Sequence, residues 1–555
     1  MLSTNGILRK LATNKLICSL FPHLPRSLSP LLLIPRSSFL IPYTTMSEPK
    51  LLELIERVEA VSPQLVDHWQ TMAIVESLGY TDRIIKEEFG FADVLEIGQY
   101  IYQRNNPPAI ETSQVEASKK GIFGEIYIFV AQFSRSFVYA IPLISLLVLG
   151  NIDTGDTWKF IPPQLAAVFT LATLASLITS GGFVTAIARR GEFYLGLNLP
   201  QQARTACLSL LGLGMLTSFG LAVLSLWFGF YRSLFTDEYL ILGTGYYLVL
   251  SLLWMLLSIL SLLSVWGTPL TLIGLTALFW GLKFQLGMGA LEAQTIAIFL
   301  ALIVLAIAVA VLFKRQRLDP LMNSEVQLPN LSATVYLLAP FFAYGIVYFC
   351  FIFADRLVAG WAVDAASGLI FAIDSAYQRA MDLALLNFLL AVPLSEYLAY
   401  RLINYWYKQA KTTQFAEIAA LSPKLGRGYL RSLGVILLFF ISLTALTVGI
   451  FEPKSWATIN PALTLMGCLG YLLLVLGLLN AVILFNLNIA SAAISALLPG
   501  LVVNLLVGYI AAVAIAPEWA VLGLVIGSTV FMVLSRRKIL QAINNPDYAY
   551  YLGGY

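Results

Sequence analysis

The sequence is poor in histidine, in charge and in cysteine, and each shortage excludes a class of chemistry. Its two histidines, His23 and His68, both precede the apolar part of the chain, which excludes histidine-based metal or acid–base catalysis within a membrane. Its four cysteines lie far apart and predict neither a disulfide framework nor a zinc site. The sequence contains no Walker loop and no basic tract suited to nucleic acid. We therefore expect no enzyme activity, no catalytic residue, no metal, no cofactor and no nucleic-acid partner.

What the chain has in abundance is apolar sequence: 59% of its residues are hydrophobic and 12% are charged. Such a chain cannot hide its apolar surface in a water-soluble core, so we predict an all-α polytopic membrane protein. We expect about twelve membrane-spanning helices in two halves of six. The halves are residues 124–313 and 333–540, and a basic cytoplasmic loop, 314–332, separates them. The predicted spans are 127–150, 160–187, 205–230, 241–264, 269–288, 293–313, 333–356, 368–398, 429–451, 462–485, 489–512 and 518–535.

The chain outside these halves divides into four short regions. Residues 1–45 contain arginine and lysine but no acidic residue, which is typical of an organelle transit peptide; the alternative is an over-called start, with initiation at Met46. Residues 46–103 are charged, with apolar residues at helical spacing, and predict a small helical cytoplasmic domain. Residues 104–123 are a polar linker and 541–555 a cytoplasmic tail. The domain is either a docking site for a partner, such as a polysaccharide synthase or export subunit, or an accessory domain with no separable activity.

The basic residues are sorted between alternate loops. With a cytoplasmic amino end, the predicted inner loops contain most of the lysines and arginines, including Arg189, Arg190, Lys314 and Arg315. The outer loops contain few basic residues beside several acidic ones. This positive-inside bias predicts that both termini are cytoplasmic. We expect a multi-pass protein of the plasma (inner) membrane, or of an organelle membrane if residues 1–45 are a transit peptide.

The two halves share features that indicate an internal repeat. The first span of each contains a proline, Pro142 and Pro340, and the second span of each ends at arginine. Six plus six spans in the same orientation fit a parallel repeat, with a substrate cavity between the halves. Pro142 and Pro340 are then hinge candidates, although prolines are common in membrane helices in any case.

Small and amide residues within the spans predict close helix packing. Glycines let backbones approach, and asparagines form hydrogen bonds between helices. The predicted packing residues are Ser180, Gly181, Gly182, Gly212, Gly214, Gly523 and Gly527. The predicted hydrogen-bonding residues are Asn387, Asn480, Asn486 and Asn504.

Most of the charge within the membrane lies on the seventh and eighth spans. Asp355 and Arg356 end the seventh span. On the eighth span Asp374, Gln378 and Asp382 are four residues apart and share one helical face, and Arg379 is close enough to Asp382 to pair with it. Ionisable groups at membrane depth usually face a cavity or the protein interior and mark a function.

In the first half, Arg135 is the lone buried cation, with Gln132 beside it. One interpretation of these charges is a cavity that binds an anionic or hydroxyl-rich substrate, with arginines holding phosphate or acidic sugar groups. The other is a set of buried ion pairs that fix helix packing. For Asp355 and Arg356 the two interpretations stay open; for the other charged residues we favour the cavity.

The chain resembles the multidrug/oligosaccharidyl-lipid/polysaccharide (MOP) flippase superfamily, and within it the PelG-type exopolysaccharide transporters. The resemblance rests on three stretches: GIVYFCFIFADRLVAGW (345–361), DLALLNFLLAVPLSEYLAYRLINYWYKQAK (382–411) and the last hairpin, which begins NAVILFNLNIASAAIS at Asn480. It covers about residues 125–540. The resemblance implies export of a polysaccharide or lipid-linked glycan by alternating access, with membrane lipid and the glycan as partners.

Two alternatives stay open. The multidrug branch of this superfamily typically uses a carboxylate in the first span for cation coupling, where this chain has Arg135. Asp374 or Asp382 can supply a carboxylate instead, which leaves a cation-coupled small-molecule antiporter. The third hypothesis is a non-transporting membrane scaffold for an envelope assembly, suggested by the additional amino-terminal domain.

Overall fold

The computed structural model describes residues 48–61, 68–105, 163–196, 199–264, 266–315, 331–362, 371, 375–412, 418–455 and 461–546. The elements in these residues are helices, with no strand among them, so the all-helical prediction is confirmed there. The chain divides into two compact units, residues 1–120 and 121–555. Each unit is described separately below.

The described residues of the amino-terminal unit form four helices around a small hydrophobic core. They are α2 (Glu48–Val61), α3 (His68–Ser77), α4 (Asp82–Glu88) and α5 (Val94–Asn105). Leu54, Ile85 and Ile97 are fully buried in this core because apolar residues recur on the inner face of each helix. The Asp82 carboxylate, at the start of α4, accepts a hydrogen bond of 2.9 Å from the Val94 N–H and so joins α4 to α5. The cytoplasmic location and the docking role of this unit stay predictions.

In its described residues the second unit contains ten helices long and apolar enough to cross a membrane. It is a multi-pass membrane protein. One shorter helix, α12, and a 3-10 turn, η5, accompany the ten helices. The bounds of all these elements are α9 (Pro163–Gly196), α10 (Pro200–Arg232), α11 (Asp237–Leu263), α12 (Gly267–Phe284), α13 (Ala290–Arg315), α14 (Leu331–Trp361), α15 (Ser375–Thr412), α16 (Ile418–Ser455), α17 (Pro461–Asn486), α18 (Ala490–Ala514), η5 (Pro517–Ala520) and α19 (Val521–Asn544).

These helices coincide with eleven of the predicted spans, with one qualification. The helix α12 forms where the span 269–288 is predicted, but it is not one of the ten that are long and apolar enough. The first predicted span, 127–150, lies outside the described residues. The number twelve and the division into two halves of six therefore stay predictions.

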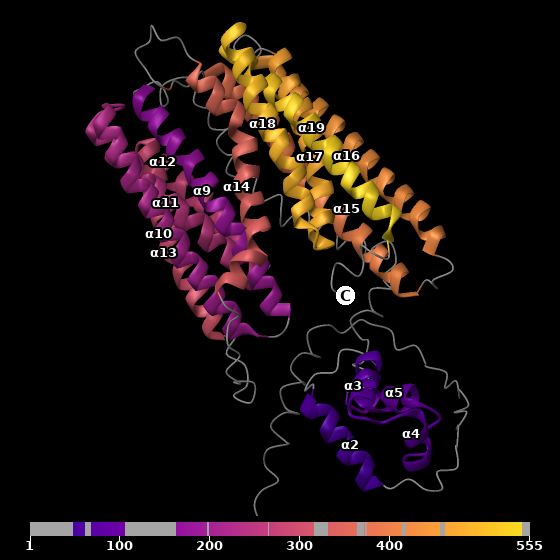
Figure 1. Cartoon of the computed structure of the whole chain (residues 1–555). Helices are drawn as coiled ribbons and strands as arrows, with labels where there is room; N and C mark the ends of the chain where they lie inside the picture. The colour runs from indigo at the N-terminus through magenta and orange to yellow at the C-terminus, as the bar shows by residue number, and fades with distance from the viewer. Residues whose placement is uncertain are drawn as a thin grey trace, which may run out of the picture. The chain divides into compact units, whose positions relative to one another are not determined.

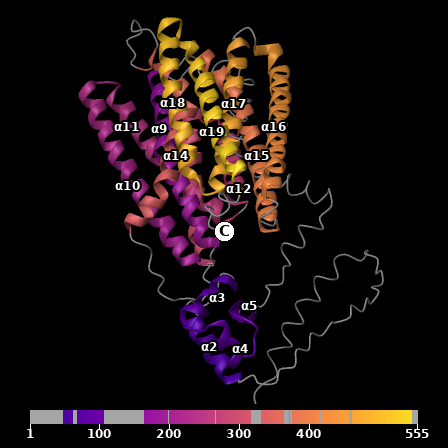
Figure 2. The ribbon, with the colours of Figure 1, turned by 45° about the vertical axis from the view of Figure 1, so that its right-hand side comes forward.

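The membrane unit is arranged as two bundles with one helix between them (Figures 1 and 2). The first bundle consists of α9 to α13 and the second of α15 to α19. The helix α14 packs against α9 on one side and against α18 and η5 on the other. In Figure 2, α10 and α11 lie at one edge of the unit and α16 at the opposite edge.

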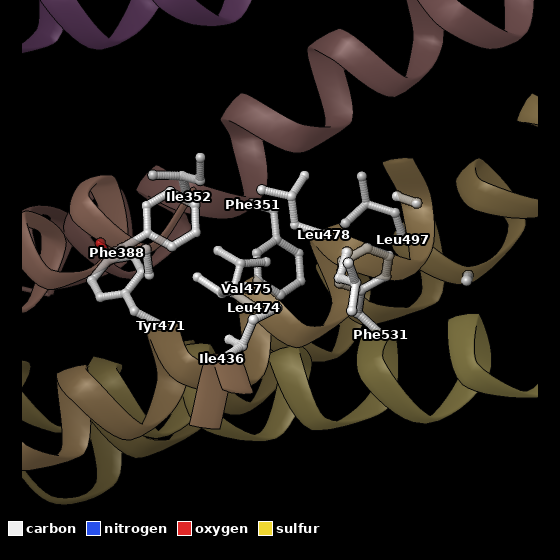
Figure 3. Packing of buried hydrophobic residues seen from close by; sticks show 14 of the residues in the cluster. Phe351, Ile352, Phe388, Ile436, Tyr471, Leu474, Val475, Leu478, Leu497 and Phe531 are labelled. Carbon is white, nitrogen blue, oxygen red and sulfur yellow. The ribbon is translucent and has the colours of Figure 1, made fainter. Parts of the chain in front are cut away.

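Each bundle has its own hydrophobic core. In the first, Met255 and Ile259 of α11 and Leu305 of α13 are fully buried. The core of the second bundle is larger and includes the inner face of α14. Phe351 of α14 lies between Phe388 of α15 and Phe531 of α19 in this core (Figure 3). By its core, α14 therefore belongs to the second bundle.

Three of the four predicted asparagines form hydrogen bonds between helices. Asn480 on α17 accepts from the Tyr429 hydroxyl (2.7 Å) and donates to Ser535 (2.9 Å). Asn387 donates to Thr447 (3.1 Å), and Asn504 donates to the Phe351 carbonyl (3.1 Å).

The predicted packing role was wrong for the fourth asparagine and for one of the glycines. The Asn486 side chain donates within its own helix, to the Val482 carbonyl (2.8 Å), so it does not bridge helices. Gly181, Gly182, Gly214, Gly523 and Gly527 all lie in close contact with another helix, but Gly212 faces open space. Gly212 lies on the outward face of α10, and the sequence does not say which face of a helix that is apolar all round turns inward.

Candidate functional site

The predicted pair Asp355 and Arg356 lies within the last two turns of α14. Both residues are buried, with 0% and 7% of the whole-residue surface exposed. A charge removed from water is costly unless it is paired and hydrogen-bonded. The partners of these two residues therefore determine what the site can do.

Arg356 is held by α15. Its Nη1 donates to the Asp382 carboxylate at 2.7 Å and to the Gln378 side-chain oxygen at 3.0 Å. Gln378 and Asp382 can both reach it because residues four apart in a helix share a face, as the sequence predicts. The ion pair is well shielded, with 9% of the Arg356 side chain and 22% of the Asp382 side chain exposed.

The predicted pairing of Asp382 with Arg379 was wrong. The structure pairs Asp382 with Arg356 of the preceding helix, whereas Arg379 is exposed. Arg379 follows Gln378 by one residue, so it is turned about 100° from the face that meets α14. Spacing within one helix favours the pair with Arg379, and only the packing of two helices brings Arg356 to Asp382.

Asp355 has a different partner. The Tyr377 hydroxyl on α15 donates to its Oδ2 at 2.8 Å. Among the described residues nothing donates to Oδ1, and the Arg356 atoms Nε and Nη2 also have no hydrogen-bond partner. The cluster thus contains a buried acceptor and two buried donors that are not engaged, which is unusual because nearly all buried polar groups are paired.

Aromatic side chains line one side of the charge cluster. Tyr471 on α17 is fully buried and lies beside Arg356 and Asp355. Its ring packs against Phe388 of α15, with the ring centres 5.4 Å apart, and Phe351 lies nearby on α14 (Figure 3). Charge held in such apolar surroundings interacts more strongly than it would in water.

Four of the predicted site residues lie outside the described residues: Gln132, Arg135, Pro142 and Asp374. Pro340 lies inside α14, where it removes one backbone hydrogen bond from the helix. Its role as a hinge stays a prediction, as does substrate binding by the charged residues. Sequence reasoning did not single out Tyr377 or Tyr471, since their hydroxyls become part of the site only when α15 and α17 pack on α14.

The second candidate feature is the contact between α9 and α14. The backbones approach at Gly181 and Gly345, where a Cβ added to Gly345 would lie 2.6 Å from the Thr185 hydroxyl oxygen. Thr185 donates to the Phe341 carbonyl (2.9 Å), next to Pro340. The rings of Phe349 and Phe342 on α14 lie over Gly181 and Gly182 of α9. Small residues on α9 thus allow a close approach, and helices in such contact can slide or tilt against each other.

A further contact between the bundles was missed from the sequence. Arg189, near the end of α9, donates to the Asn488 side chain at 3.1 Å and lies 5.0 Å from the centre of the Phe341 ring. Asn488 belongs to the turn between α17 and α18 and has a left-handed backbone (φ 57°), which asparagine tolerates better than most residues. Phe341 in turn stacks on Phe485 at 5.5 Å. The only signal in the sequence was the Arg189–Arg190 pair, which we had assigned to the cytoplasmic loop.

Comparison with known proteins identifies the fold of the membrane unit. No family model matches the sequence, and no curated protein matches it significantly. Among solved structures it is similar to a MATE transporter in complex with MaD3S (14% identity, TM-score 0.52, 75% of this chain and 96% of that one). It is also similar to an outward-facing multidrug resistance MATE family transporter of the MOP superfamily (13%, 0.51, 75% and 96%). A third is a MATE transporter in the bent conformation (14%, 0.52, 76% and 96%).

At these identities the similarity is one of fold. It agrees with the predicted resemblance to the MOP superfamily, of which the second structure is a member. It does not show closeness to the PelG type. The membrane unit of this chain has the fold of the MATE transporters.

Proposed function

We propose that the protein is a membrane transporter that moves its substrate by alternating access between two helical bundles. One observation carries the proposal: α14 is attached to the second bundle by the Arg356–Asp382 ion pair and meets the first bundle along the glycine contact with α9. A helix tied by an ion pair to one bundle and packed on the glycines of the other supports tilting of the bundles against each other. The shared MATE fold supports the same conclusion.

For the substrate, we propose a polysaccharide or lipid-linked glycan exported from the cytoplasm, as the resemblance to PelG-type transporters implies. The exposed Arg379 on α15 fits a role in holding phosphate or acidic sugar groups, since a guanidinium forms paired hydrogen bonds with such groups. The protein would lie in the plasma membrane with both termini in the cytoplasm.

The test is deletion of the gene, followed by analysis of surface and released polysaccharide. We expect loss of one polymer and accumulation of its precursor inside the cell. Wild-type protein and the control Arg431→Gln, an exposed arginine on α16, should restore export, and Arg379→Gln should not. An unchanged glycan profile after deletion would rule out this substrate class.

One observation favours a second candidate, a cation-coupled small-molecule antiporter. Asp355 is fully buried, and its Oδ1 has no hydrogen-bond donor among the described residues. A carboxylate oxygen in this state is available to a proton or a small cation, which would offset the cost of its burial. In vesicles, substrate efflux driven by a pH or sodium gradient should then be lost in Asp355→Asn and kept in the control Glu292→Gln on α13.

The same vesicles address the scaffold hypothesis. A purified protein that moves neither a lipid-linked glycan nor a cationic dye, under any gradient, would favour a non-transporting role. Movement of either substrate by the purified protein alone would remove that hypothesis.

A further inference from the structure

A cavity lies away from the buried charge cluster, at the start of α10. Its volume is about 660 Å³. That is within the range of sites for small organic groups. It is lined by Pro200, Gln201, Arg204, Thr205, Leu208 and Ser209 of α10 and by Phe313 of α13.

The charge around this cavity is positive. Arg204 is exposed and lines it, and the first turn of α10 has no acidic residue. Directly after Phe313, the last turn of α13 adds the exposed residues Lys314 and Arg315. The positive end of the α10 helix dipole adds to the attraction for an anion. Three cations, and a helix whose first turn holds no acidic residue, favour a ligand with a phosphate group.

The hydroxyls in the cavity do not compete with Arg204 for this role. Thr205 donates to the Gln201 carbonyl (3.0 Å) and Ser209 to the Ala206 carbonyl (2.9 Å), so both hydroxyl protons are engaged in the helix. Recognition of an anion is therefore left mainly to the guanidinium of Arg204.

The surface that continues from the cavity is apolar. Arg204, Leu208, Gly212 and Leu216 are four residues apart and so follow one face of α10. Leu208 and Leu216 are exposed, and Gly212 has no other atom within 4 Å of the place where a Cβ would be. Only 22% of the apolar stretch of α10 is buried, against 61% for α11, so α10 presents this face outward. In a membrane it contacts lipid.

We call the exposed surface along Leu208, Gly212 and Leu216 the apolar track. A basic cavity continuous with this apolar track matches the charged headgroup and the apolar chains of a phospholipid. We propose that this cavity binds an anionic phospholipid, with the phosphate at Arg204 and an acyl chain along Leu208, Gly212 and Leu216. Bound there, the lipid joins the ends of α10 and α13. A soluble phosphate compound would use Arg204 but gain nothing from the apolar track.

The experiment uses the full-length purified protein in detergent and measures lipid binding by native mass spectrometry. The probes are phosphatidylglycerol, phosphatidylcholine and the soluble headgroup analogue glycerol phosphate. We expect wild-type protein to bind phosphatidylglycerol more tightly than either of the others. Binding of glycerol phosphate as tight as that of phosphatidylglycerol would overturn the assignment to a lipid.

Two variants with matched controls locate the site. Arg204→Ala should weaken phosphatidylglycerol binding about tenfold or more, as expected for a lost charge-assisted hydrogen bond. Arg232→Ala, at the opposite end of the same helix, should leave it unchanged. Gly212→Phe places a ring on the apolar track at a position where an added Cβ meets no atom within 4 Å, and should also weaken binding. Gly274→Phe, at an equally open position on α12, should not. Equal affinities for Arg204→Ala and Arg232→Ala, or an unchanged affinity in Gly212→Phe, would overturn the proposal.

Discussion

The two bundles of the membrane unit differ in the polar groups that they bury. In the first bundle these are mainly hydroxyls, together with the cations Arg190 and Lys283. The Trp254 N–H donates to Ser176 at 3.3 Å, and the Tyr247 hydroxyl donates to Thr179 at 3.1 Å. The second bundle, with α14, buries the Arg356–Asp382 ion pair, the Asp355 carboxylate and several amides. Among the described residues, Asp355 is the only buried acidic side chain.

This difference shows how α14 is positioned. A serine or threonine hydroxyl can donate to a carbonyl of its own helix, as Ser180 does to Ser176, and therefore needs no second helix. A charge or a carboxamide in an apolar interior needs a partner from elsewhere, and so ties one helix to another. Such ties hold α14 to α15 and α18, whereas α9 meets α14 through Gly181 and Gly182 and through the hydrogen bond from Thr185 to the Phe341 carbonyl. We expect the second bundle and α14 to move as one body.

The largest effect is expected from breaking the ion pair. Asp382→Asn removes the charge that balances the buried Arg356, and we expect a loss of about 3 kcal/mol of stability, at the lower end of the usual range because Asp382 keeps some exposure. Thermal unfolding of the purified protein in detergent measures this. The matched change in the first bundle, Ser176→Ala, should cost about 1 kcal/mol. Equal losses would contradict the difference between the bundles.

The next effect concerns movement rather than stability. Gly345→Val places a side chain against Gly181 and Thr185 of α9, so we expect transport to stop while the cost in stability stays about 1–3 kcal/mol. Transport in vesicles, compared with the unfolding temperature, separates the two effects. Gly274→Ala on α12 is the control: it fills open space and should leave transport unchanged. Transport at the wild-type rate in Gly345→Val would argue against tilting along this contact.

A third prediction compares two asparagines on α17. Asn480→Leu leaves the buried Tyr429 hydroxyl without its acceptor and should cost about 1–3 kcal/mol. Asn486→Leu removes a hydrogen bond within the same helix and should cost less than about 1 kcal/mol. Both are read from the unfolding temperature. A larger loss for Asn486→Leu would show that amides within one helix matter as much as those between helices.

The smallest effect is expected at Arg189. Its hydrogen bond to Asn488 and its contact with Phe341 are partly exposed and together should stabilise the contact between the bundles by about 1 kcal/mol. Arg189→Ala should therefore increase about fivefold the population in which the ends of α9 and α17 are separated. Distances between spin labels on the two helices measure this population, with Arg315→Ala as the control. An unchanged distance distribution would mean that Arg189 does not hold the bundles together.

Much of the helical architecture follows from the sequence because a span must be long and apolar. The predicted spans at 462–485 and 489–512 coincide with α17 and α18 to within a few residues. The span at 269–288 is the exception: α12 has eighteen residues and is not among the ten candidate spans. The residues of the ion pair were also predicted, since charge within an apolar segment stands out whatever its partner.

The sequence by itself determined that the chain is a multi-pass helical protein, and it located the charge on the seventh and eighth predicted spans. Both depend on local composition, which needs no knowledge of neighbouring helices. Only the tertiary structure decided that Arg356 pairs with Asp382, that Tyr377 donates to Asp355, and that α14 lies between the bundles. These contacts depend on how each helix is rotated about its axis. In helices that are apolar nearly all round, that rotation is set by the neighbours and not by the pattern of the helix itself.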